Sequence, residues 1–414
     1  MAHDNEKFYY QCVDCGHVYH DDGIRYLCPE CSRDQKPDEA PRGVLKVLYP
    51  YGEIKKNRPD FEALKANSFL DLYPVQKRES FPPLRVGQTP LYKIGRLNGE
   101  NLKDELFLKD DSQNPTYSFK DRASTLVAAF AKERGIDRII TASTGNAGSS
   151  LAGICASSGQ KAIVLVPEKA PLAKLTQIVM YGAAIVPVKG TYDDAFDLSV
   201  KATEKFGWYN RNTAFNPMTI EGKKSVAFEL FDQMQQTVPD RIFVPVGDGV
   251  IISGVYKGFE DLLELGFIDK MPIVVAVQSA GSDNLARNAF SETIEFRSSN
   301  TLADSISVDI PRNFFMARQF LQKYQGEVLT VEDHAIMEAS KQLSANTGLF
   351  SEPAAATAFA GYLHYSQNGR LATGSKNIVL LTGSGLKDLK AVQSVISIPG
   401  AIYPDLSELQ NLIS

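Results

Sequence analysis

The sequence predicts an α/β fold in which helices cover parallel sheets. From residue 139 to about residue 210, apolar runs alternate with amphipathic stretches, which predicts strands at 162–166, 184–188 and 208–210 and helices at 172–180 and 193–206. A second α/β layer starts at residue 242 and includes the apolar runs at 273–277 and 378–381. Such alternation is typical of parallel strands joined by right-handed crossovers.

Length and composition indicate a globular protein that is not embedded in a membrane. The 414 residues, 43% of them hydrophobic, are enough for two or three domains. No apolar run approaches the ~20 residues that cross a bilayer, and residues 1–7 lack the charged-then-apolar order of a signal peptide. With a net charge of −5 and no basic run, we expect a cytoplasmic protein with no nucleic-acid and no membrane partner.

Four cysteines near the start of the chain form two C-x-x-C pairs with twelve residues between them: Cys12, Cys15, Cys28 and Cys31. Thiolates in this arrangement are typical ligands of a tetrahedral, structural zinc ion. Disulfides are disfavoured in a reducing compartment, and His17 and His20 are alternative ligands. The pattern predicts a zinc-ribbon-like module at residues 1–46. Because this is a separate small module, chelation of the metal should destabilise residues 1–46 but leave the cofactor site largely intact.

A lysine stands at the expected start of a helix. Lys120 ends the segment Asn-Pro-Thr-Tyr-Ser-Phe-Lys and precedes the apolar run at 126–129. Free N–H groups, the positive end of the helix dipole and partial burial all destabilise an ammonium group at this position. A lysine of this kind forms Schiff bases with carbonyls, including the aldehyde of pyridoxal phosphate (PLP). Lys120 is therefore the candidate catalytic and cofactor-anchoring residue.

Two strand-to-helix turns offer further ligand groups. Residues 138–143 and 161–167 predict strands that flank a turn at 144–148 and a helix at 149–157. The free N–H groups of this turn suit a substrate carboxylate, at Ser143, Thr144 and Gly145, and the Asn146 amide suits a phenolate oxygen.

The second turn follows the apolar run that begins at residue 242. Its backbone N–H groups converge in a way that suits a phosphate dianion. The turn matches neither a P-loop nor a dinucleotide fingerprint, so a nucleotide is disfavoured. Farther along, Thr382 ends the strand at 378–381 and offers a hydroxyl to a pyridine nitrogen. The residues of the phosphate turn are Gly247, Asp248, Gly249, Val250 and Ile251.

Together these segments resemble the fold-type II (tryptophan synthase beta-like) PLP enzymes, and among them threonine synthase and its close relatives. Lys120, Asn146, the turn at 247–251 and Thr382 fall on the family's cofactor motifs, and the similarity covers roughly residues 85–390. The resemblance implies a large PLP-binding domain at 47–130 and 225–414. A smaller domain at 131–224 would close over an amino-acid substrate.

The resemblance implies a lyase of threonine biosynthesis, which converts O-phosphohomoserine and water to threonine and phosphate. A homodimer is compatible with the sequence. Two alternatives stay open. One is another PLP-dependent eliminase or β-replacement enzyme, such as a threonine or diaminopropionate lyase or a cysteate-synthase-like enzyme. The other is a zinc-ribbon interaction protein with an inert body.

One departure from the family bears on the substrate. Thr219 stands where the family has an arginine that helps to bind the substrate's phosphate, and a threonine lacks that charged fork. Arg211 is the first candidate to replace it, with Lys223 and Lys224 as others, although each is equally readable as a solvated surface charge. Smaller departures are Tyr117 for a glycine, Ser384 for a histidine, and Asp248 and Val250 in the phosphate turn.

Overall fold

A computed structural model describes residues 6–20, 23–36 and 39–413, whose strands form three sheets. Most of residues 1–7, which were searched for a signal peptide, lie outside the described residues, as do Pro37 and Asp38 of the N-terminal module. Within the described residues, no helix is both long and apolar enough to span a bilayer.

The N-terminal sheet is antiparallel, in the order β2-β1-β3. β3 ends two residues beyond the predicted end of the module at residue 46. The N-terminal module packs on the body, since Phe8, Tyr10 and Val47 belong to the same hydrophobic core as Phe130 and Tyr209. The strands of the N-terminal sheet are β1 (Tyr9–Cys12), β2 (Val18–Tyr19) and β3 (Leu45–Leu48).

The second sheet is fully parallel, in the order β8-β7-β6-β9, which confirms the alternation read from the sequence. Helix α4 begins at Asn146, three residues earlier than predicted, because Gly145 already ends the extended backbone as its N-cap. The strands are β6 (Arg138–Ala142), β7 (Lys161–Pro167), β8 (Ala184–Val188) and β9 (Tyr209–Asn210). The helices are α4 (Asn146–Ser158), α5 (Leu172–Met180) and α6 (Tyr192–Phe206).

The third sheet has the order β12-β11-β10-β13-β5-β4, and only β4 at its edge runs antiparallel. Because β10, β13 and β5 are parallel neighbours, their carboxyl ends meet at one edge of the sheet. The strands are β4 (Leu91–Leu97), β5 (Glu100–Asp110), β10 (Arg241–Pro245), β11 (Ile273–Ser279), β12 (Glu327–Val331) and β13 (Lys376–Leu381).

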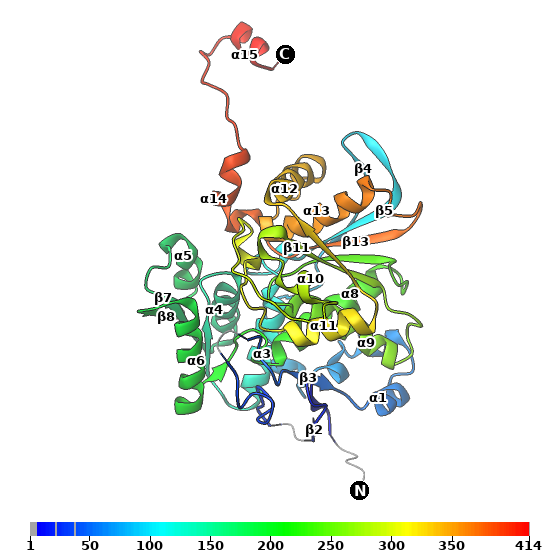
Figure 1. Ribbon diagram of the computed structural model, residues 1–414, viewed down its shortest axis with the longest axis vertical. Helices are drawn as coiled ribbons and strands as arrows, with labels where there is room; N and C mark the ends of the chain where they lie inside the picture. Colours follow the sequence, from blue (N-terminus) through cyan, green and yellow to red (C-terminus); the bar gives the residue numbers. More distant parts are fainter. Residues whose placement is uncertain (1–5, 21–22, 37–38, 414) are drawn as a thin grey trace.

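Helices cover both faces of this sheet (Figure 1). Successive strand residues point to opposite faces: Ile242 and Val244 join one core, and Phe243 joins the other. The first core includes residues of α3 (Lys120–Glu133), α7 (Met218–Lys223), α8 (Ser225–Gln233), α9 (Val250–Glu264), α10 (Asn284–Asn288) and α11 (Phe314–Lys323). The second includes residues of α12 (Asp333–Thr347) and α13 (Pro353–Gln367).

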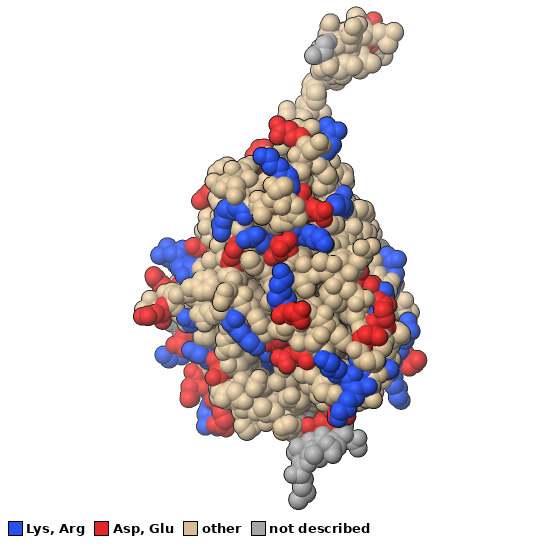
Figure 2. All heavy atoms as spheres, turned by 90° about the vertical axis from the view of Figure 1, so that its right-hand side faces the viewer, with Lys and Arg blue, Asp and Glu red and all other residues tan. Residues whose placement is uncertain are grey.

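The remaining helices lie nearer the two ends of the chain. α15 sits at the end of a segment that leads away from the rest of the molecule (Figure 1). On the face shown in Figure 2, acidic and basic side chains are interspersed. The helices that lie nearer the two ends of the chain are α1 (Tyr51–Asn57), α2 (Phe61–Ala66), α14 (Leu389–Val392) and α15 (Leu406–Ile413).

Candidate active site

The loop before Lys120 is joined to the end of β13. The Phe119 N–H donates to the Thr382 carbonyl at 2.9 Å, and Ser118 forms a bridge with Gly383. α3 then begins at Lys120, as the sequence predicts. Its first turn is fixed by Asp121, whose carboxylate accepts from the Thr116 N–H at 2.7 Å. This places Lys120 at the sheet edge where β5 and β13 end.

The Lys120 amine is poised for chemistry rather than engaged in structure. Among the described residues, its Nζ has no hydrogen-bond or ion-pair partner. Burial lowers the pKa of Lys120, although the nearby Glu352 carboxylate acts in the opposite direction. An unpaired amine with a lowered pKa is more readily available as a nucleophile or a proton carrier.

The turn between β10 and α9 has the geometry of an anion cradle. Gly249 has a φ of +82° and is the N-cap of α9. A Cβ on Gly247 would stand 2.9 Å from the Ile306 Cα, so a larger residue does not fit. No acceptor for the N–H groups of residues 247–252 occurs in the described part of the chain. The Asp248 side chain is held back by the Arg312 N–H at 3.1 Å.

Asn146 and Thr382 lie close to a carboxylate that the sequence did not single out. The Asn146 Nδ2 donates to both oxygens of Glu352, at 3.0 and 3.1 Å. Glu352 packs so tightly on Gly383 that a Cβ there would lie 2.3 Å from its Oε1. The Thr382 hydroxyl is buried and has no partner among the described residues. Burial raises the pKa of Glu352, opposed by Lys120.

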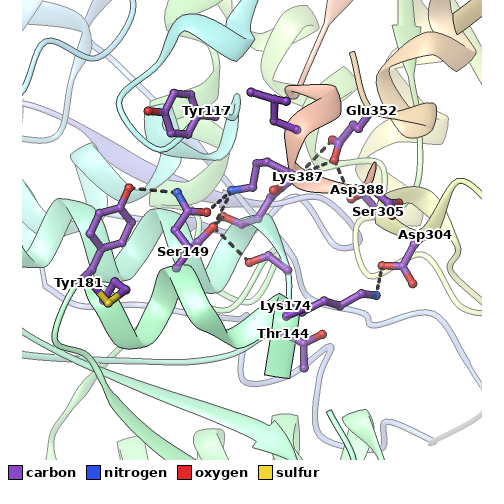
Figure 3. Close-up of a pocket in the computed structure, with 16 residues that line it drawn as sticks. Tyr117, Thr144, Ser149, Lys174, Tyr181, Asp304, Ser305, Glu352, Lys387 and Asp388 are labelled. Atoms are coloured by element: carbon purple, nitrogen blue, oxygen red, sulfur yellow. Dashed lines mark hydrogen bonds and ion pairs between the residues drawn. The ribbon is translucent and has the colours of Figure 1, made fainter. Parts of the chain in front are cut away.

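A cavity of about 530 Å³ lies between helices α4 and α5 on one side and Glu352, the N-cap of α13, on the other. Thr144 and Gly145, which were predicted to bind the substrate, line this cavity together with Asn146. The other predicted site residues do not line it: Ser143, Lys120, Arg211, Thr382 and the turn at 247–251. Figure 3 shows Lys387 reaching into it beside Ser149 and Glu352. The Lys387 Nζ donates to the Ser149 Oγ at 2.9 Å and to the Gln177 Oε1 at 2.8 Å.

All three cations proposed to replace the family's arginine are buried, so their interpretation as solvated surface charges is wrong. Arg211 directly follows β9, and its Nε donates to the Ser124 Oγ at 3.2 Å. Its buried NH2 group has no hydrogen-bond partner. Burial lowers the pKa of Arg211 to about 10. Lys224 instead pairs with Glu221 and Asp261.

The four cysteines form one cluster, with their sulfur atoms all within 4.8 Å of one another. They are free thiols. The Cys12–Cys31 and Cys15–Cys28 sulfur pairs are 3.7 and 3.9 Å apart, close to the ~3.8 Å between ligands of a tetrahedral zinc with bonds of ~2.3 Å. His20 pairs with Glu6 at 2.8 Å and lies outside the cluster, as does His17. The set fits a four-thiolate site.

Comparison with known proteins identifies the family. Residues 83–383 match the family described as pyridoxal-phosphate dependent enzymes. The chain belongs to this family. It is 35% identical to the threonine synthase of Methanocaldococcus jannaschii, with 97% of this chain and 98% of that protein covered. The threonine synthase of Methanosarcina acetivorans is 32% identical, with 98% of each chain covered.

Solved structures confirm the fold-type II prediction. The processed threonine deaminase isoform 2 of Solanum lycopersicum has a TM-score of 0.63 at 20% identity, covering 77% of this chain and 88% of that chain. Maize serine racemase has a TM-score of 0.63 at 22% identity, covering 79% and 94%. At such identities these two structures show the fold alone. The family makes the chain a PLP-dependent enzyme, so the interpretation as an inert body is wrong.

The donor groups of the site fit PLP. The unpaired Lys120 amine meets the need for a covalent anchor, and the free N–H groups at 247–252 meet the need for a phosphate cradle. The buried Thr382 hydroxyl lacks the partner that a pyridine nitrogen would supply. Asn146 has a donor in place, although it is shared with Glu352.

Two residues of the site were not predicted. These two residues are Glu352 and Lys387. For Glu352, its position before Pro353 at the start of α13 was the available signal. Burial lowers the pKa of Lys387 to about 8, and Glu352 and Asp121 oppose this. The contacts of Glu352 with Asn146 and of Lys387 with Ser149 cannot be seen in the sequence, because the partners are far apart along the chain.

Proposed function

We propose that this chain is a threonine synthase, which converts O-phosphohomoserine and water to threonine and phosphate. The observation that supports it most is the unpaired Lys120 amine at the sheet edge that also carries a preformed phosphate cradle. That constellation occurs in a chain 35% identical to a threonine synthase over 97% of its length. Threonine biosynthesis is then its role, in the cytoplasm, as a monomer or homodimer.

Each predicted residue has a distinct task in this proposal. Lys120 anchors the cofactor and then moves protons at Cα and Cβ of the substrate. The N–H groups of the turn hold the cofactor's phosphate, Asn146 donates to its phenolate oxygen, and Thr382 is a neutral partner for its ring nitrogen. PLP, when bound, supplies an electron sink. The turn residues are Gly247, Asp248, Gly249, Val250 and Ile251.

The substrate would be held from the smaller unit, residues 131–224, which closes over the large PLP-binding domain, residues 47–130 and 225–414. Ser143, Thr144 and Gly145, at the N-terminus of α4, orient the α-carboxylate. Arg211 provides positive charge for the distal phosphate group, since its guanidinium has an unused donor. We also propose that Cys12, Cys15, Cys28 and Cys31 bind a structural zinc ion.

The decisive experiment uses the purified holoenzyme. O-phosphohomoserine is added, and phosphate and threonine are measured together, because the proposed reaction releases them in equal amounts. Serine, threonine and diaminopropionate are offered in parallel as controls. Turnover of one of these without phosphate release from O-phosphohomoserine would replace the proposal with the eliminase alternative.

A further inference from the structure

The last part of the chain, residues 396–413, forms an arm that leads away from the body. After the buried Val392, the backbone runs as a connector to α15, which stands clear of the other elements (Figure 1). None of the described residues of α15 is buried. The hydrogen bonds of Tyr403, Asp405 and Ser407 stay within the arm. The arm therefore has no packing contact with its own body to explain its helix.

Helix α15 has one apolar face, which is open to solvent. Leu406, Leu409 and Ile413 are spaced by three and four residues, so together with Leu412 they share one side of the helix. Leu406 is 82% exposed and Ile413 is 75% exposed. An isolated helix as short as α15 is marginal in water, and a contiguous exposed apolar face is typical of an interaction site. The helix therefore calls for a partner surface.

A matching surface lies on α5, in the smaller unit. Of the nine described residues of α5, only Ile178 is buried. Leu172, Val179 and Met180 are 76%, 52% and 79% exposed, and their spacing of seven and eight residues places them on one side of the helix. Helix α5 thus presents an apolar stripe of the same kind and length as the apolar face of α15.

The connector favours a second copy over the same chain as the partner of the arm. Residues 393–405 can span up to about 40 Å at ~3.3 Å per residue, yet they start close to Leu386 and Asp388, which border the same cavity as α5. Pro399 and Pro404 bias the connector toward extended backbone, which carries the arm away from its own α5. Pairing brings no like charges together, because the arm has no lysine or arginine and α5 has no carboxylate.

We propose that the arm of each copy docks on α5 of a second copy, so that two chains exchange their arms around a two-fold axis. The exchange makes two identical contacts, as closed symmetry requires of a homodimer. With α5, the arm supplies about as many residues as the ~20–30 that each side contributes to a stable interface. Because α5 also lines the cavity, the partner's arm borders the candidate active site. The connector adds further exposed apolar side chains to the contact: Ile396, Ile398, Ile402 and Tyr403.

A disulfide trap tests which chain receives the arm. Val179→Cys and Leu409→Cys are placed in separate copies with tags of different size, which are co-expressed, purified as holoenzyme and mildly oxidised. A covalent product with both tags should form, and mass spectrometry should place its new bond between positions 179 and 409. Each variant expressed alone is the control for bonds to the native cysteines. The double variant in one chain completes the test, since a bond closed within that chain, with no two-tag product, would overturn the proposal.

Self-association gives a second readout, with a matched pair of variants on α15. Leu409 is at the centre of the apolar face and Asn411 is on the opposite side of the helix. Leu409→Asp should raise the dissociation constant of the dimer about tenfold or more, measured by sedimentation, because it places a charge in an apolar contact. Asn411→Asp adds the same charge and should stay within about threefold of the unmodified enzyme. On the receiving helix, Leu172→Asp should reproduce the effect of Leu409→Asp. Equal constants for the two α15 variants, or an unmodified enzyme that is monomeric at micromolar concentration, would contradict the exchange.

Discussion

At the scale of single residues, the site depends on the Lys120 amine, which makes no hydrogen bond or ion pair with the described residues. Lys120→Ala should abolish turnover, because the same Nζ is assigned both the anchoring of the cofactor and proton transfer. The fold should survive, since the side chain has no partner to lose among the described residues. Activity, covalently bound cofactor by mass spectrometry, and circular dichroism are measured together. A variant with a near-normal rate and bound cofactor would remove Lys120 from both roles.

The backbone conformation at Tyr117 is unfavourable for a bulky side chain. It has a φ of +65°, a region that a bulky side chain rarely adopts, and it lines the cavity mouth. Tyr117→Gly should therefore raise the free energy of unfolding by about 1 kcal/mol as strain is released. Tyr117→Ala is the matched control, because it removes the ring but retains a Cβ and the strain. Equal urea stability of the two variants would attribute the effect to the ring.

Short motifs indicate candidate cofactor residues, but not the charges around them. The turn at 247–251, Asn146 and Thr382 were assigned from backbone geometry and short segments, and their cofactor roles stay a prediction. Arg211 was ranked ahead of Lys223 and Lys224, but the surroundings of the three could not be predicted, because what separates them is whether a carboxylate distant in sequence lies beside each one. Glu352 was not predicted as a site residue, because its contact with Asn146 spans 206 residues of sequence.

At the scale of elements, the zinc module supports the substrate side of the site. The Tyr26 hydroxyl accepts from the Asn210 N–H at 2.9 Å, one residue before Arg211. Tyr26 also stacks on Phe215 with ring centroids 4.6 Å apart. Just after β3, Tyr49 donates to Glu221, two residues before Lys223. The module therefore braces the segment that carries Arg211, and the residues just after β3 brace α7.

Removal of the metal should consequently affect the substrate site as well as residues 1–46. A chelator should raise the KM for O-phosphohomoserine several-fold while PLP absorbance changes little, because the cofactor contacts come from other elements. Elemental analysis before and after chelation supplies the control for metal content. An unchanged KM in metal-free enzyme would show that the module keeps its packing without zinc.

The strands predicted from the sequence include β6, β7 and β13, whereas β5 was missed. β6, β7 and β13 are continuous apolar runs in the sheet interior. β5 carries several charged residues and pairs with the edge strand β4, so its apolar run is short. Lys109 within it is buried only because Glu229 neutralises it at 2.8 Å. Sequence patterns do not reveal such a long-range partner.

At the scale of the whole molecule, two buried ion networks connect its parts. Glu229 on α8 pairs with Arg122 of α3 at 2.6 Å and with Lys109 of β5. Glu260 on α9 pairs with Lys46 of β3 at 2.6 Å and with Lys323 of α11 at 3.0 Å. The first network joins the large sheet to its helices, and the second joins the zinc module to the body.

These networks predict a joint response to acid. Burial alone would raise the pKa of Glu229, but Arg122 and Lys109 outweigh it and lower the value to about 2. Lys46 and Lys257 likewise outweigh burial at Glu260 and lower its pKa to about 2. A carboxylate with a depressed pKa stabilises the fold fully above its unfolded value of ~4.3 and loses that contribution as the pH falls toward 2.

Each carboxylate should thus contribute on the order of 3 kcal/mol at pH 6 that is absent at pH 2. Urea unfolding between pH 5 and pH 3 should show a steep loss of stability that added salt changes little, because the pairs are buried. Glu260→Gln should remove part of the pH dependence by stranding Lys46. Since Lys46 lies in β3, the same variant should weaken zinc retention, measured by elemental analysis after dialysis. A constant unfolding free energy over this pH range would mean that neither network holds the parts together.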